Sequence, residues 1–148
     1  MRNIERMLLE LNANFNGDAW HGTPIRLLLD GIDETKANAH PIAGAHSIAE
    51  LVAHITAWTN VVERRLAGDE VDVTTAQDFP ATKGVAFAEL VSDLEAAHTR
   101  LVDTLARTHE SRFDEIVAGK DYSVEHMLHG LVSHYAYHGG QIALLLKQ

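Results

Sequence analysis

The chain has 148 residues, of which 46% are hydrophobic and 22% are charged, a composition typical of one globular domain and unlike a disordered or collagen-like chain. Its 12 Lys and Arg residues against 21 Asp and Glu residues give a net charge of −9, which argues against a general nucleic-acid binder. The absence of cysteine excludes disulfides, thiolate metal ligands and a cysteine nucleophile. We therefore expect a single domain over residues 1–148.

The apolar stretches of the sequence are short. Glu5, Glu10 and Asp18 interrupt the first 30 residues, so we expect no signal peptide. No apolar run approaches the ~18 residues needed to cross a bilayer. These features predict a cytoplasmic protein that associates with neither membranes nor nucleic acids.

The first part of the chain predicts one longer and two short helical segments. Apolar residues at three- and four-residue spacing predict an amphipathic helix over about 3–14. Thr23 followed by Pro24 predicts an N-cap with proline at the first helical position, and a short helix that ends near Gly31. A further short turn is expected to begin at 33–34 and to stop before Pro41.

Three longer helices follow. Ser47 and Glu50 form a capping-box pattern, in which each side chain satisfies a backbone N–H of the other residue. The apolar spacing predicts helices over about 48–67, 85–108 and 124–147, with a loop over 69–84 and a polar connection over 109–121. No segment alternates apolar and polar residues, so we predict no strands. The fold class is therefore all-α, a four-helix bundle with short additional helices.

Ten histidines are an unusual number for a chain of this length. His134 and His138 fall on the apolar face of the last predicted helix, one turn apart, which is the geometry with which two imidazoles hold one metal ion. His126 and His129 lie toward the opposite side and are expected to be partly exposed. Two ligands do not make a catalytic site, because such sites have three protein ligands and an open position.

Two histidines compete for the place of a third ligand. His54 lies at the edge of the apolar stripe of the helix over 48–67, and His98 lies in the middle of the stripe of the helix over 85–108. A histidine on an apolar face is more often hydrogen-bonded in a core than bound to metal. Burying unpaired imidazoles is costly, so some partner is expected, and tyrosine, backbone or water would also serve.

Three segments carry a family resemblance. The segment 129–142, His129-Gly-Leu-Val-Ser-His134-Tyr-Ala-Tyr-His138-Gly-Gly-Gln141-Ile142, resembles the signature of the DinB-like family, also called DinB/YfiT-like metal-dependent hydrolases. The segments 44–58 and 18–22 fit the same family, so the resemblance covers essentially the whole chain. It implies an up-down-down-up four-helix bundle with a long crossover. It also implies a divalent metal, zinc or nickel, held by His54, His134 and His138.

The same resemblance suggests which residues surround the metal. It implies that Trp20 and His21 lie beside the pocket, although packing at a helix start would explain them equally well. It makes His98 a pocket or packing residue rather than a ligand. Gln141 belongs to the signature and is expected either to tune the site or to cap a neighbour.

Three neutral imidazoles leave a bound ion its full charge and one or more open positions, which suits activation of water or of a thiol. Relatives in the resembled family include thiol-dependent S-transferases and a thiol-dependent isomerase, so we favour transfer of a low-molecular-weight thiol to a small-molecule electrophile. This reaction needs no protein nucleophile. The alternatives are a hydrolase using metal-bound water, with Glu50 as a weak candidate base, and a non-catalytic metal-binding stress-response protein.

A line of small residues follows the back of the last predicted helix, at His129, Ser133, Ala136, Gly140 and Ala143. Small residues let helices approach closely. The pattern predicts tight packing within the bundle, or across a homodimer, and it leaves open a metal-free helical interaction module.

Overall fold

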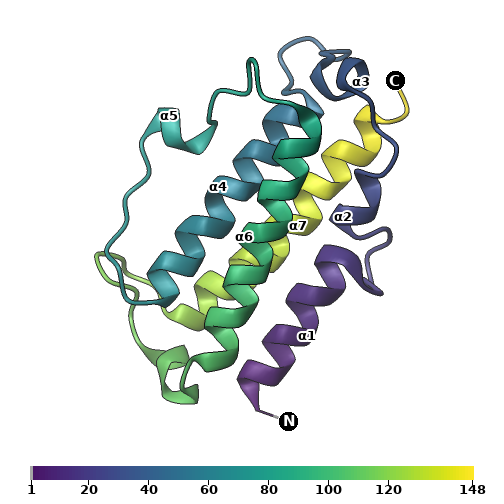
Figure 1. Ribbon diagram of the computed structural model, residues 1–148. Coiled ribbons are helices and arrows are strands. Elements are labelled where there is room, and N and C mark those ends of the chain that lie inside the picture. Colours follow the sequence, from purple (N-terminus) through teal and green to yellow (C-terminus); the bar gives the residue numbers. More distant parts are fainter. Residues whose placement is uncertain (1) are drawn as a thin grey trace.

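The computed structural model describes residues 2–148, and four long helices form its body (Figure 1). They are α1 (Asn3–Asn16), α4 (Ile48–Leu66), α6 (Phe87–Arg107) and α7 (Val124–Leu145). Helices α1 and α7 run in one direction along the bundle, and α4 and α6 run in the other (Figure 1). The predicted all-α, up-down-down-up bundle is therefore confirmed, and residues 2–148 contain no strand beyond one isolated bridge between Ile116 and Ser123. None of the helices formed by these residues is both long and apolar enough to span a membrane.

Four short elements connect the long helices: α2 (Ile25–Leu28), α3 (Glu34–Asn38), α5 (Thr75–Asp78) and the 3-10 helix η1 (Glu110–Asp114). The loop predicted over 69–84 is wrong for Thr75–Asp78, which form α5. Thr74 and Gln77 start α5 with a capping box that the sequence already contains.

Helix boundaries differ from the predictions by a few residues. Helix α1 continues to Asn16, because the backbone N–H of Gly17 still reaches the carbonyl oxygens of Ala13 and Asn12. Pro24 is the N-cap of α2 rather than its first helical residue, since its backbone is extended, with φ −67° and ψ 154°. Thr23 therefore does not cap this helix.

Helix α4 begins with the predicted capping box. The Ser47 hydroxyl accepts a hydrogen bond from the Glu50 backbone N–H at 3.1 Å, and a Glu50 carboxylate oxygen accepts one from the Ser47 N–H at 3.0 Å. The two bonds satisfy backbone donors that a helix start otherwise leaves without partners.

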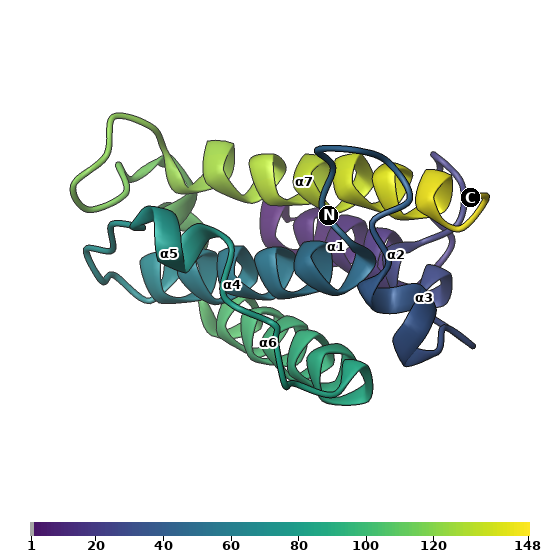
Figure 2. The same cartoon turned by 90° about the horizontal axis from the view of Figure 1, so that it is seen from above.

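The parallel direction of α4 and α6 determines the path of the chain between them. Helices α4 and α6 finish at the same end of the bundle. The segment 67–86 must therefore return along the length of the bundle before α6 can begin. Figure 2 shows this crossover passing over α4 and carrying α5 with it. The crossover therefore places Asp78, the last residue of α5, against the middle of α4.

Apolar side chains from all four long helices fill the core. The fully buried ones include Leu11 of α1, Ile55 of α4, Leu101 of α6 and Leu128 of α7. Six polar side chains are also buried among the described residues, and they are more informative than the apolar ones because burial of a polar group requires a partner. They are Ser47, His54, Thr59, Arg65, His98 and His138.

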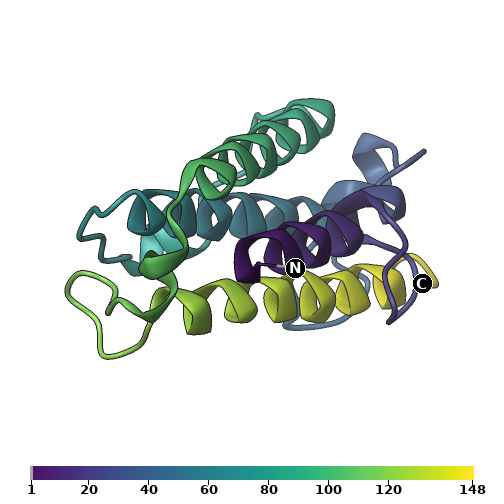
Figure 3. The ribbon, with the colours of Figure 1, turned by 90° about the horizontal axis from the view of Figure 1, so that it is seen from below.

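Only part of the small-residue line on α7 is covered within the described chain: Ala136 and Ala143 are partly buried, and Nδ1 of His129 lies 3.6 Å from a Glu10 carboxylate oxygen on α1. His129, Ser133 and Gly140 are exposed, and a Cβ added to Gly140 would meet open space. Figure 3 shows α7 along one edge of the bundle with α1 beside it. The close approach occurs one residue earlier, where Gly139 faces Leu28 of α2.

Candidate metal centre

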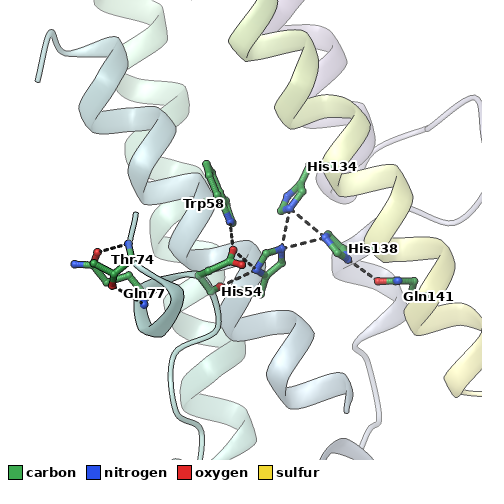
Figure 4. A network of polar contacts seen from close by, with 8 residues as sticks. His54, Trp58, Thr74, Gln77, His134, His138 and Gln141 are labelled. Atoms are coloured by element: carbon green, nitrogen blue, oxygen red, sulfur yellow. Dashed lines mark hydrogen bonds and ion pairs between the residues drawn. The ribbon is translucent and has the colours of Figure 1, made fainter. Parts of the chain in front are cut away.

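Three imidazole rings meet between α4 and α7. Helix α4 contributes His54, and successive turns of α7 contribute His134 and His138 (Figure 4). The Nε2 atom of His54 lies 3.0 Å from that of His134 and 3.1 Å from that of His138, and the latter two atoms are 3.1 Å apart. We call these residues the three-histidine group.

Hydrogen bonds on the outer side of two rings determine which nitrogen carries the proton. Nδ1 of His54 lies 2.7 Å from the backbone carbonyl oxygen of Asp78, and Nδ1 of His138 lies 2.6 Å from Oε1 of Gln141. A carbonyl oxygen only accepts, so each Nδ1 is the donor and each neutral ring keeps a lone pair on Nε2. Both lone pairs point to the centre of the group. This is how outer partners orient histidine ligands in metal sites.

The Asp78 side chain and an aromatic stack hold the His54 ring further. Oδ1 of Asp78 lies 3.2 Å from Nδ1 of His54 and accepts a hydrogen bond of 2.7 Å from Nε1 of Trp58. The ring of Phe79 stacks on the ring of His54 with 4.1 Å between centroids, and His46 stacks on the other side of Phe79. The crossover thus restricts both the plane and the tautomer of His54.

Burial favours the uncharged form of His134 and His138. It lowers the pKa of His134 to about 3, with the neighbouring histidines adding to the effect, and it also lowers the pKa of His138. Nδ1 of His134 is buried and has no hydrogen-bond partner among residues 2–148. Neutral imidazole is the form that binds metal ions.

The spacing of the ring nitrogens suits a metal ion. Ligand nitrogens about 2.0–2.1 Å from an ion are about 2.9 Å apart at right angles and about 3.3–3.4 Å apart at tetrahedral angles. The observed 3.0–3.1 Å falls between these values. Lone pairs facing one another in a buried space repel, and a cation between them removes that repulsion. The three-histidine group could therefore hold a divalent ion, and imidazole ligands suit zinc and nickel alike.

A cavity of about 420 Å³ lies beside the three-histidine group. It is lined by His54, Trp58, Val62, Arg65, Asp78, Tyr122, His126, Met127, Gly130, Leu131 and His134. Its long walls come from α4 and α7, and most of the lining is apolar. A molecule of modest size can therefore reach the inner side of the imidazoles.

His98 lies apart from the three-histidine group. Its ring stacks on Phe15 with 3.8 Å between centroids, and its nitrogens lie 3.3 Å from the Tyr135 hydroxyl and 3.1 Å from Oδ1 of Asn12. Burial lowers its pKa to about 4. It is a hydrogen-bonded core histidine, and the cavity beside the three-histidine group does not include it.

The other predicted pocket residues separate into two kinds. Gln141 touches His138, as described above. Trp20 is fully exposed and His21 is exposed, and neither lines the cavity. Glu50 also lies off the cavity, since its carboxylate contacts Ser47, His40 and His46 at the start of α4.

The sequence reasoning missed four residues of this region: Trp58, Arg65, Asp78 and Tyr122. Trp58 ends the family-like segment 44–58, and its position four residues after His54 places it on the same helix face, a spacing that could have indicated its role. Asp78 carried no signal of its own, because its contact with His54 depends on the path of the crossover. Arg65 and Tyr122 come from separate elements and meet only in the folded chain.

An antiparallel pair of long helices that presents three converging imidazoles beside a cavity defines a helical-bundle protein with a candidate metal site. The model of the DinB superfamily matches residues 19–142, and the chain belongs to that superfamily. The resemblance inferred from the sequence motifs is thereby confirmed. A search of curated proteins finds no significant match.

Proposed function

We propose that this protein is a metal-dependent enzyme in which a divalent ion, zinc or nickel, is held by His54, His134 and His138 and activates a small thiol for transfer to an electrophile. A bound divalent ion lowers the pKa of a thiol or water that completes its coordination. The protein's part is to hold three neutral imidazoles in place and to admit the two reactants from one side.

The convergence of three Nε2 atoms within 3.0–3.1 Å, at the edge of a largely apolar cavity, is the observation that carries this proposal. Asp78 and Gln141 keep the outer nitrogens of His54 and His138 protonated, so the inner nitrogens of these two rings are free to bind. Val62, Met127 and Leu131 form apolar walls, which favour an apolar reactant over bulk water.

A thiol fits this site better than water does as the nucleophile. Hydrolysis needs a general base near the attacking water. The Glu50 carboxylate accepts a hydrogen bond from the Ser47 N–H at the start of α4. Asp78 is the one carboxylate in the described lining of the cavity, and it accepts a hydrogen bond from Nε1 of Trp58. A thiol has a pKa of about 8.5 and needs far less help to ionise. Hydrolysis with Asp78 as base is the runner-up.

Metal content tests the site. We expect about one zinc or nickel ion per chain in purified protein by elemental mass spectrometry, and little in a His134→Ala/His138→Ala variant. The matched control is His109→Ala/His129→Ala, which removes two exposed histidines that do not line the cavity. Equal metal content in both double variants would contradict the site.

A thiol panel tests the reaction. With monochlorobimane as the electrophile, we expect conjugation that requires both a thiol and the metal. Ester hydrolysis without any thiol would favour the runner-up. One metal per chain without either activity would favour the non-catalytic alternative.

A further inference from the structure

Arg65 is a buried charge in the wall of the cavity. It lies in the last turn of α4 and is only 5% exposed. Its Nε and Nη2 atoms donate to the carbonyl oxygen of Val71 at 3.1 and 2.7 Å, and Nη1 donates to the Tyr122 hydroxyl at 2.9 Å. No carboxylate among residues 2–148 forms an ion pair with it. A buried cation without a counter-ion is costly, so an anion that pairs with Arg65 would be strongly favoured.

Arg65 and Tyr122 each keep hydrogen-bond donors that these contacts do not use. A guanidinium has five N–H groups, and three are used, which leaves one on each of Nη1 and Nη2. The Tyr122 oxygen accepts from Arg65, so its own hydrogen is available to another acceptor. Paired N–H groups are the arrangement that binds carboxylates in a bidentate manner.

The guanidinium and the three-histidine group face the same cavity. The guanidinium carbon lies 5.8 Å from the centre of the Trp58 ring, and that ring lies 6.3 Å from the ring of His134. Val62, Met127 and Leu131 line the space alongside. One small molecule with an apolar middle can therefore reach both ends.

The carboxylates nearby do not form a contact ion pair with Arg65. Asp78 is at the histidine end, against His54 and Trp58. Asp72 lines a neighbouring hollow that also includes Arg65 and Tyr122, and the Arg65 charge adds to the effect of Lys120 in lowering the pKa of Asp72, but the Asp72 carboxylate is exposed and its ion pair is with Lys120. The end of the cavity formed by Arg65 is thus locally positive in a chain whose net charge is −9.

We propose that Arg65, assisted by Tyr122, binds the carboxylate of an organic-acid substrate whose reactive end lies at the three-histidine group. The identity of the reactive end rests on the function proposed above. The recognition of the carboxylate rests on Arg65 and the cavity alone.

The test compares hexanoate with hexanamide, two probes of equal size that differ in charge. Binding is followed by calorimetry and by the fluorescence of Trp58 in a Trp20→Phe background, which removes the other tryptophan. We expect hexanoate to bind about 10- to 100-fold more tightly than hexanamide, because hydrogen bonds between charged groups add this much affinity. Arg65→Gln should make the two probes equal. Arg64→Gln, which removes an exposed arginine paired with Asp69, should leave the preference intact.

Two further variants keep the test decisive if Arg65→Gln does not fold. Tyr122→Phe removes one hydroxyl and should reduce the preference for hexanoate several-fold. Arg65→Lys should also reduce it, because an ammonium group lacks the planar pair of N–H donors of a guanidinium. Equal binding of the two probes to the unsubstituted protein would overturn the proposal, and so would a preference unchanged in these variants.

The same titrations are run on metal-loaded and chelator-treated protein. We expect the preference for hexanoate in both. A preference that vanishes with the metal would assign the carboxylate to the ion and overturn the role of Arg65. Neither probe carries a thiol or undergoes turnover, so failure of the thiol-transfer proposal would leave this result unaffected.

Discussion

His54 contacts two parts of the protein through its two ring nitrogens. Nδ1 donates to the crossover at Asp78, and Nε2 faces the rings of His134 and His138 on α7. His138 is arranged in the same way, with Gln141 as its outer partner. In each case the outer hydrogen bond determines the tautomer, and the tautomer determines whether the inner nitrogen can bind a cation.

Replacing Gln141 by leucine should therefore weaken metal binding without abolishing it. His138 would lose the acceptor that holds its Nδ1 proton, and outer partners of this kind typically contribute 10- to 100-fold in affinity. Competition with a chelator of known affinity measures the change. Gln148→Leu, at the exposed end of the chain, is the matched control and should bind metal as the unsubstituted protein does. Equal affinity in the two variants would show that Gln141 does not position His138.

Helix α4 links the metal site to the architecture. Its first turn is closed by the Ser47–Glu50 capping box, its middle carries His54, and its last turn carries Arg65. Because α4 is parallel to α6, the chain must cross back over it, and this crossover supplies the outer partner of His54. The helix thus places both ends of the cavity on one rigid element.

Ser47→Ala should destabilise the protein by about 1 kcal/mol, because the Glu50 backbone N–H would lose its acceptor at a buried helix start. The free energy of unfolding in urea measures the effect. Ser133→Ala is the comparison, since its exposed hydroxyl only bonds back to the carbonyl oxygen of His129 within α7. We expect that substitution to be neutral or slightly stabilising. An equal loss in both variants would argue against the cap.

The whole molecule buries several histidines in their neutral form, and this makes its stability depend on pH. Burial lowers the pKa of His98 to about 4, below the value of about 6.5 that the unfolded chain has. The unfolded state then binds more protons than the folded state between these two pH values. The stability contributed by the neutral ring is therefore complete above about pH 6.5 and is lost as the pH falls toward 4.

Metal-free protein should accordingly unfold more easily as the pH is lowered from 7.5 to 4.5. His98 alone should contribute a slope of at most about 1.4 kcal/mol per pH unit. His98→Leu should make the free energy of unfolding depend less steeply on pH, whatever it does to stability at neutral pH. The slope depends on the difference in bound protons between the folded and unfolded states, and a change in packing alone does not alter it. Unfolding free energies across this range test both statements, and an unchanged slope in His98→Leu would contradict them.

The sequence by itself was sufficient for the four long helices, for the capping box of α4 and for the shared face of His134 and His138. These features depend on residues within one or two turns of each other. The motif in 129–142 was also sufficient for the family. Local patterns of this kind need no knowledge of the rest of the chain.

Only the tertiary structure decided which helix faces meet. Helical periodicity alone allowed His54 or His98 beside the pair on α7, since both lie on or near inward stripes, and the packing of α4 against α7 brings His54 there while His98 pairs with Tyr135 and Asn12. The positions of Asp78 and Arg65 beside the cavity could not be predicted from the sequence either. Contacts between residues tens of positions apart depend on how whole helices pack and on the route of the crossover, and no local spacing encodes either.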